Sequence, residues 1–240
     1  MAETDTATPA ADTDYSWWWR CLRPPLQAIF RCLFAWRIHG VGRIPSGGPA
    51  LIAPNHMSFL DPLFFCLCVV RRKRGIRFIT AAEFFPKRGI GFFLRAMHQI
   101  PIKRGQRDTK ALDDAKAALR EGALVGIYPE GKINEHPSQL LPGRSGVARL
   151  AIETNTPILP AGIWGPQFRL PKSGVMWRRP LRTRVTIVFG DPIWPDPTDE
   201  SEDAIQRLTE RVMEEIERLR VAAKGDTERR RGAREDPALA

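Results

Sequence analysis

Cysteine is scarce in this sequence, which has four cysteines in 240 residues. Their spacings fit neither a zinc framework nor a disulfide scaffold, so we expect reduced thiols, no metal site and no metal cofactor. Long hydrophobic runs are also lacking, since none reaches the roughly 18 apolar residues of a membrane-spanning helix. The acidic N-terminal stretch Met1–Asp5 lacks the basic start and apolar core of a secretory signal, so we expect no such signal.

Acidic residues are too few to balance the basic ones. Lysine and arginine number 37 against 27 aspartates and glutamates, which gives a formal net charge of +10 at pH 7. This excess favours an anionic partner, such as a membrane surface, a phosphate-bearing substrate or nucleic acid. The chain has no zinc-finger spacing, basic zipper or aromatic RNA-binding motif, so we expect no nucleic-acid partner.

The N-terminal region divides into two parts. Residues 1–14 are polar and of low complexity, which predicts a disordered N-terminus. Residues 15–39 contain three consecutive tryptophans beginning at Trp17, then a short helix from Leu26 with one broad apolar face. Such a helix either packs on the domain core or lies in the lipid interface, with tryptophans at headgroup depth and arginines near anionic lipid. The tryptophans favour the second interpretation, an amphipathic membrane-associating segment over 15–39.

Apolar segments of strand and helix type alternate after the Gly/Pro-rich loop at 40–49. This alternation predicts a single α/β domain over residues 40–223, with a mostly parallel mixed sheet flanked by helices. Residues 224–240 are rich in arginine and glutamate, which predicts a disordered tail. The expected strands are 50–54, 76–80, 98–102, 123–128, 158–163 and 183–189, and the expected helices are 58–70, 89–96, 108–120, 145–154 and 200–222.

A histidine follows the first expected strand, in the segment Asn55–Asp61. Five residues are little more than one helical turn, so Asp61 can reach back to the imidazole of His56. A carboxylate on one ring nitrogen fixes the tautomer and leaves the other nitrogen free to accept a proton. Alternatively, Asn, Ser and Asp at such a position only cap the start of a helix. The other motifs of the chain favour the first interpretation, a general base.

Four segments in order along the chain form a combined pattern: Asn55–Asp61, Ile100–Arg104, Tyr128–Gly131 and Thr156–Gly162. Together they resemble the motifs of the glycerolphosphate acyltransferase superfamily, in particular the 1-acylglycerol-3-phosphate acyltransferases. The resemblance covers roughly residues 40–190, the usual size of one domain. One position departs from the family pattern, because Ile133 stands where the family has an arginine near the substrate phosphate.

The resemblance implies transfer of a fatty acyl chain from acyl-CoA or acyl-carrier protein to a hydroxyl of a lysophosphatidate, giving phosphatidic acid at the cytoplasmic face of the cell membrane. His56 is the expected base and Asp61 its orienting carboxylate, with backbone amides at the following helix start as donors to the oxyanion. No Gly-x-Ser-x-Gly elbow is present, which argues against an acyl-serine route. The expected substrate-binding residues are Asn55, Ser58, Lys103, Arg104, Glu130, Gly131, Lys132 and Arg144.

Two alternatives stay open. The acceptor is another lysophospholipid or a glycolipid, since Ile133 replaces the family arginine. Otherwise the chain is a non-catalytic lipid-binding protein on the same fold, although such a protein needs neither His56 nor Asp61. If the chain is an acyltransferase, with lysophosphatidate or with another acceptor, the expected partners are a membrane phospholipid surface, a lysolipid acceptor and an acyl thioester donor.

Overall fold

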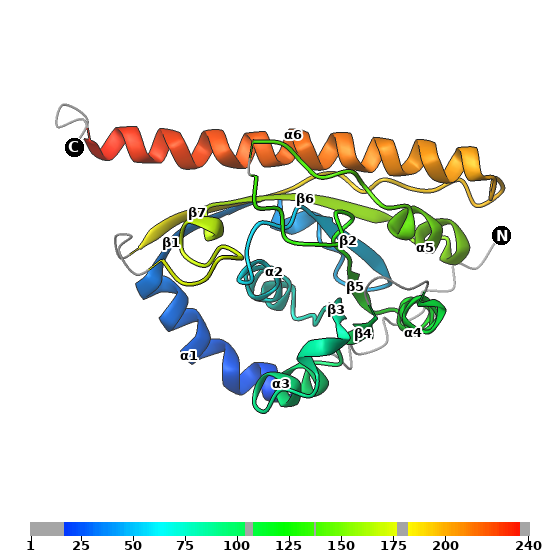
Figure 1. The fold of residues 1–240 in the computed structure, drawn as a ribbon, viewed down its shortest axis with the longest axis horizontal. Coiled ribbons are helices and arrows are strands. Elements are labelled where there is room, and N and C mark those ends of the chain that lie inside the picture. The colour runs from blue at the N-terminus through cyan, green and yellow to red at the C-terminus, as the bar shows by residue number, and fades with distance from the viewer. Residues whose placement is uncertain (1–16, 104–107, 137, 177–181, 236–240) are drawn as a thin grey trace, which may run out of the picture.

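The computed structural model describes residues 17–103, 108–136, 138–176 and 182–235. Its centre is a sheet of seven strands in the order β1-β7-β6-β2-β5-β3-β4 (Figure 1). Neighbouring strands pair in parallel, apart from the antiparallel pair β6–β7. The expected α/β fold with a mostly parallel mixed sheet is therefore confirmed. The strands are β1 (Phe34–His39), β2 (Ala50–Pro54), β3 (Arg77–Ala81), β4 (Ile100–Ile102), β5 (Leu124–Gly126), β6 (Ile158–Trp164) and β7 (Thr183–Phe189).

Helices cover both faces of the sheet. Along β2 the side chains alternate between two cores: Ile52 packs with residues of α1 and α2, whereas Leu51 and Ala53 pack with residues of α4, α5 and α6. Because both faces are covered, β2 is buried along its whole length. The helices are α1 (Trp17–Leu33), α2 (Asp61–Val69), α3 (Ile90–Ala96), α4 (Thr109–Arg120), α5 (Gly146–Thr154) and α6 (Glu202–Glu235), with short 3-10 turns at Val41–Arg43, Val70–Arg72, Ala82–Phe84 and Pro166–Phe168.

Strand β1 was not expected, because its residues were assigned to the membrane-associating segment 15–39. Helix α1 ends at Leu33, and the next six residues pair in parallel with β7. Apolar side chains at 34, 36 and 38 alternate with more exposed positions, which is the period of a strand. The apolar helix residues just before them hide this period in the sequence. The segment is therefore part helix and part edge strand of the α/β domain.

Helix α1 contacts the core through one side, with Leu22, Leu26 and Leu33 packed against it. Phe30 is buried, and its ring meets the ring of Phe64 in α2 at 4.9 Å in an edge-to-face arrangement. Ile29, by contrast, is 53% exposed, so the apolar surface of α1 is only partly covered by the domain. Among the residues that the structure describes, no helix combines the length and the apolar character needed to cross a bilayer.

Helix α6 is longer than expected and runs across the face of the sheet opposite α1 and α2 (Figure 1). It continues to Glu235, so the expected disorder is wrong for residues 224–235; residues 236–240, like the predicted disordered N-terminus, lie outside the described ranges. Tertiary contacts explain the extra turns, because Asp226 accepts a hydrogen bond from Thr186 of β7 at 2.9 Å and Arg230 donates to the Ala35 carbonyl of β1 at 2.6 Å.

Gly162 of β6 shows how closely α6 approaches the sheet. A Cβ atom at this position would lie 2.3 Å from the backbone carbon of Leu219. Only glycine leaves room for a helix backbone this near to a strand. The other strands and helices expected after residue 40 are present, and their ends differ by at most three residues from the predicted ones, whereas α1 begins at Trp17, well before the expected start at Leu26.

Candidate active site

The candidate site lies at the carboxyl end of β2, where sites gather in parallel sheets. Asn55 follows the strand directly and is fully buried. Its carboxamide oxygen accepts from the Ile163 amide at 2.8 Å, and its nitrogen donates to the Ile163 carbonyl at 3.1 Å. Both ends of this side chain therefore join the loop to β6. The expectation that Asn55 binds substrate has no support from this geometry.

His56 and Asp61 form the pair that the sequence predicts. Nδ1 of His56 lies 3.0 Å from Oδ2 of Asp61, the first residue of α2. The His56 side chain is 11% exposed, whereas the Asp61 side chain is fully buried. Within the described parts of the chain, no residue hydrogen-bonds the other ring nitrogen, Nε2. The pair therefore has an oriented imidazole with one nitrogen available to a substrate.

Asp61 also binds the backbone of the loop. Its Oδ2 accepts from the amides of Met57 at 2.7 Å and Ser58 at 2.8 Å. One oxygen of Asp61 therefore contacts the ring and the loop together, whereas the helix start has no side-chain cap, because no side chain forms a cap hydrogen bond at Leu60, the N-cap residue of α2. Backbone amides at the start of the following helix were the expected donors to an oxyanion. Of these, the amide of Ser58, the first residue of the expected helix, donates to Asp61 instead.

The turn after β5 forms hydrogen bonds with the backbone of His56. Glu130 is buried, and its two oxygens accept from the amides of His56 at 2.8 Å and Leu141 at 3.0 Å. The Asn134 amide donates to the His56 carbonyl at 2.7 Å. Burial raises the pKa of Glu130, and the hydrogen bonds from Leu141 and His56 partly oppose that shift. Glu130 therefore fixes the histidine backbone, a role that the sequence did not predict.

The ring of Tyr128 lies flat against the ring of His56. Their centroids are 3.9 Å apart and their planes differ by 17°. Phe78 of β3 also stacks with Tyr128, with 5.4 Å between the ring centroids. Burial raises the pKa of Tyr128 well above its usual value, and the negative charge of Asp61 adds to this. The sequence pattern places Tyr128 only in a turn motif. The aromatic residue two positions before Glu130 was the one feature of the sequence that could have indicated a ring at the site.

Ser58 is not a free nucleophile. Its hydroxyl donates to the Leu170 carbonyl at 2.6 Å and accepts from the Leu60 amide at 3.1 Å. It therefore shapes the loop between β2 and α2. This agrees with the argument against an acyl-serine route.

The basic residues expected near the substrate phosphate are only partly gathered. Ile133 is buried and carries no charge, whereas Lys132 is exposed. Arg144 is exposed and lies directly over Gly131, where an added Cβ would be 2.7 Å from the guanidinium Nε. The Arg144 amide donates to the Pro129 carbonyl at 2.9 Å, which holds the arginine beside the turn. Arg144 is thus the expected cation that the fold places next to this turn.

The second basic segment follows β4. Lys103 is exposed, and its backbone amide donates to Asp108 at 2.7 Å. Arg104 lies outside the described residues, so its role stays a prediction. In the ranges that the structure describes, no group of three or more His, Cys, Asp or Glu side chains is arranged to hold a metal ion.

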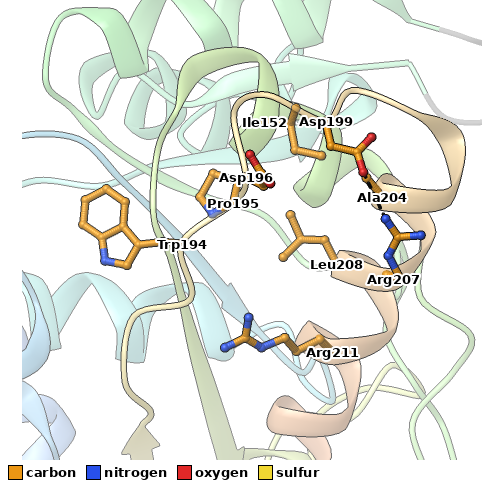
Figure 2. Close-up of a pocket in the computed structure, with 9 residues that line it drawn as sticks. All are labelled: Ile152, Trp194, Pro195, Asp196, Asp199, Ala204, Arg207, Leu208 and Arg211. Carbon is orange, nitrogen blue, oxygen red and sulfur yellow. Dashed lines mark hydrogen bonds and ion pairs between the residues drawn. The ribbon is translucent and has the colours of Figure 1, made fainter.

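Two clefts elsewhere contain none of the predicted site residues. One, of about 300 Å³, is lined by Trp194, Arg207 and Arg211 among others (Figure 2), and the other, of about 390 Å³, shares Trp194. Both lie near the first residue of β6, because Ile193 pairs with Ile158. This is the amino end of the parallel strands, opposite the end that holds the histidine. Neither cleft offers a group for the chemistry described above.

A buried carboxylate that orients a histidine at the carboxyl end of the parallel strands is an arrangement that can serve as a general base in an enzyme. The family model described as Acyltransferase matches residues 35–164, more than half of the chain. The chain therefore belongs to the Acyltransferase family, and it is an O-acyltransferase. The resemblance noted from the sequence motifs is confirmed.

Individual relatives are distant. A 1-acyl-sn-glycerol-3-phosphate acyltransferase of Bacillus subtilis is 24% identical over 159 residues, which cover 65% of this chain and 73% of that protein. An uncharacterized protein of Mycobacterium leprae is 25% identical over 235 residues; the match covers 82% of this chain and 62% of the longer relative. The 1-acyl-sn-glycerophosphate acyltransferase PlsC of Thermotoga maritima superposes with a TM-score of 0.62 over 86% of this chain and 78% of that one, at 21% identity, which shows a shared fold.

Proposed function

We propose that this protein transfers a fatty acyl chain from an acyl thioester to a hydroxyl of 1-acyl-glycerol-3-phosphate, giving phosphatidic acid for phospholipid synthesis. The names of its characterised relatives support this acceptor class. The single observation on which the proposal rests is the 3.0 Å contact between His56 and a buried carboxylate, with the second ring nitrogen available.

The reaction follows from this geometry. Nε2 of His56 takes the proton of the acceptor hydroxyl while the oxygen attacks the thioester carbonyl. The carbon–sulfur bond then breaks, and the thiolate takes the proton from the imidazolium. Asp61 stabilises the imidazolium in between, because its charge is buried 3.0 Å from the ring. The products are an ester and a free thiol, and no covalent acyl-enzyme is formed.

The test replaces the base. His56→Ala is expected to keep the fold and to lose about 10²–10⁴-fold in acyl transfer, the usual worth of a positioned base. Release of free thiol from acyl-CoA or from acyl-carrier protein, measured with lysophosphatidate as acceptor, reports activity and shows which donor is used. His39→Ala is the control, because His39 is an exposed histidine outside the site. Wild-type activity in the His56 variant would reject the mechanism, and thioester-independent lipid binding alone would favour a non-catalytic protein.

For the acceptor headgroup, we assign the phosphate to Arg144. Its guanidinium lies over Gly131, one residue after the glutamate that holds the His56 backbone. Within the described part of the chain, no carboxylate pairs with this side chain. A guanidinium can bind two phosphate oxygens through parallel N–H bonds, which an ammonium group cannot do. The arginine missing at position 133 is thus replaced from a later segment.

A panel of acceptors tests this assignment. Arg144→Ala is expected to raise KM for lysophosphatidate by about 10-fold or more, and Arg144→Lys to restore only part of the loss. Monoacylglycerol, which has no phosphate, is expected to be used equally by all variants. Arg207→Ala serves as the control, because Arg207 lines a pocket that contains none of the predicted site residues (Figure 2). If a glycolipid or another lysophospholipid is the better acceptor for the wild type, the substrate proposal fails while the acyltransfer mechanism stands.

We also propose that the protein binds the cytoplasmic face of the cell membrane peripherally, through the side that carries α1 and α3. Ile29 of α1 is 53% exposed, and Ile90 and Phe92 of α3 are 51% and 60% exposed. Phe59, three residues after His56, is 44% exposed and touches Phe84 just before α3, which places apolar surface beside the site. Arg20, Arg31, Lys87 and Arg88 are exposed cations of the same segments. Each cation near an anionic surface adds about 1 kcal/mol to membrane binding.

Vesicle co-sedimentation tests the membrane proposal. The double variant Ile90→Ser, Phe92→Ser is expected to bind anionic phospholipid vesicles at least 10-fold more weakly than the wild type, because it removes two large apolar side chains. Val221→Ser is the matched control, since Val221 is an exposed apolar residue (51%) of α6 on the other side of the sheet. Equal binding by the double variant and the control would show that this face does not contact lipid.

A further inference from the structure

Three rings, one of which is the imidazole of the proposed base, are stacked in the site. Phe78, Tyr128 and His56 lie nearly parallel, with centroid separations of 5.4 and 3.9 Å and interplanar angles of 12° and 17°. Gly126 makes this stack possible, because a Cβ there would lie 2.3 Å from the Phe78 ring. The ring of Phe78 can therefore lie against β5 at Gly126 and pack on Tyr128.

The hydrogen bond to Asp61 does not fix the imidazole by itself. A single contact at Nδ1 leaves the ring free to tilt about the line between Nδ1 and Oδ2. A flat surface 3.9 Å away removes that tilt and so determines where Nε2 points. An aromatic face within about 6 Å also attracts a cation, so it favours the imidazolium that forms when the base takes a proton.

The hydroxyl of Tyr128 takes no visible part in this. It is buried, and no described residue forms a hydrogen bond with it. A buried hydroxyl without a partner costs stability, so the ring is the part of this side chain that serves the site. The other ionisable groups that contact His56 are Asp61 of α2, through Nδ1, and Glu130 of the following turn, through the backbone amide.

We propose that Tyr128 is a positioning residue for the acyl transfer: its ring face orients the His56 imidazole and stabilises the protonated form during turnover. The proposal rests on the proposed function of His56 as the base. It predicts that an aromatic ring at position 128 is needed and that the hydroxyl is not.

Substitution tests this first. Tyr128→Phe is expected to keep kcat within about twofold and to be at least as stable as the wild type, because it removes an unpartnered buried hydroxyl. Tyr128→Leu is expected to lower kcat by about 10-fold, with KM for both substrates unchanged. Loss of activity in the Phe variant would overturn the proposal by showing that the hydroxyl acts. Full activity in the Leu variant would overturn it by showing that no ring is needed.

A second measurement needs neither catalysis nor a stable Leu variant. Phenylalanine and its di-, tri- and pentafluorinated forms at position 128 keep the shape of the ring but weaken the negative face step by step. The NMR titration midpoint of the His56 imidazole, identified by its absence from His56→Ala, is expected to fall by about half to one pH unit along this series. The same series at Phe189, which packs against Phe65 in the core, is the control and is expected to leave the midpoint unchanged. A midpoint that stays constant across the series at position 128 would refute the proposal even if the enzyme proves to use a different acceptor.

Discussion

Replacement of Asp61 separates the two tasks of its carboxylate. One oxygen, Oδ2, accepts from the ring of His56 at 3.0 Å and from the amides of Met57 and Ser58 at 2.7 and 2.8 Å. In Asp61→Asn the amide oxygen can take this place, and the two backbone donors hold it there because an NH2 group would meet them donor to donor. The tautomer of His56 is therefore preserved and the negative charge is lost, while the NH2 group takes the place of Oδ1, which is buried and has no hydrogen-bond partner among the described residues.

The expected magnitudes differ sharply between two substitutions. Asp61→Asn is expected to lower kcat by about 10²–10³-fold, because the imidazolium loses its counter-charge. Its free energy of unfolding is expected to stay within about 1.5 kcal/mol of the wild type, since three hydrogen bonds remain. Asp61→Ala leaves two buried amides unpaired at about 1–3 kcal/mol each, so it is expected to cost about 2–6 kcal/mol.

Two assays check these values. Thiol release from acyl-CoA gives kcat, and thermal unfolding is expected to show a loss of about 2–4 °C for each kcal/mol in a domain of this size. Nitrogen-15 NMR of the histidines reports the tautomer directly. An Asn variant with wild-type kcat would refute the role of the charge. An Asn variant as unstable as the Ala variant would refute the shared-oxygen geometry.

Three further predictions concern the site and the stability of the fold. Because burial raises the pKa of Glu130, the folded protein holds the Glu130 proton more tightly than the unfolded chain does. The resulting stabilisation is complete below about pH 4.5 and is lost as the pH rises through the pKa of the folded state. Urea unfolding at pH 4–8 is therefore expected to show that the difference in free energy of unfolding between the wild type and Glu130→Gln changes with pH. Truncation after residue 223 removes the hydrogen bonds of Asp226 and Arg230 and is expected to lower the free energy of unfolding by about 2–4 kcal/mol. Thermal unfolding measures this loss, and an unchanged melting temperature would show that this part of α6 is dispensable. In the native protein a thiol reagent is expected to modify the exposed Cys21 and Cys32 and to spare the buried Cys66 and Cys68. Burial raises the pKa of Cys66 to about 12, which further slows its reaction. Modification of all four cysteines would contradict the packing of α2.

The sequence alone determined the class of fold and the central pair. Alternating apolar segments gave the α/β architecture, because strand and helix periods depend only on local spacing. The five-residue separation of His56 and Asp61 was enough to place them together, since one turn of chain brings them within reach. Both predictions rest on short-range geometry.

Long-range contacts decided the rest. Strand β1 exists because β7 pairs with it, and the end of α6 is a helix because side chains of β7 and the backbone of β1 bind it; both partners are distant in sequence. Glu130 binds the His56 backbone across 74 residues, and Tyr128 meets the His56 ring only because β5 lies beside β2. The order of strands in the sheet, which local spacing does not contain, thus determined how the base is held.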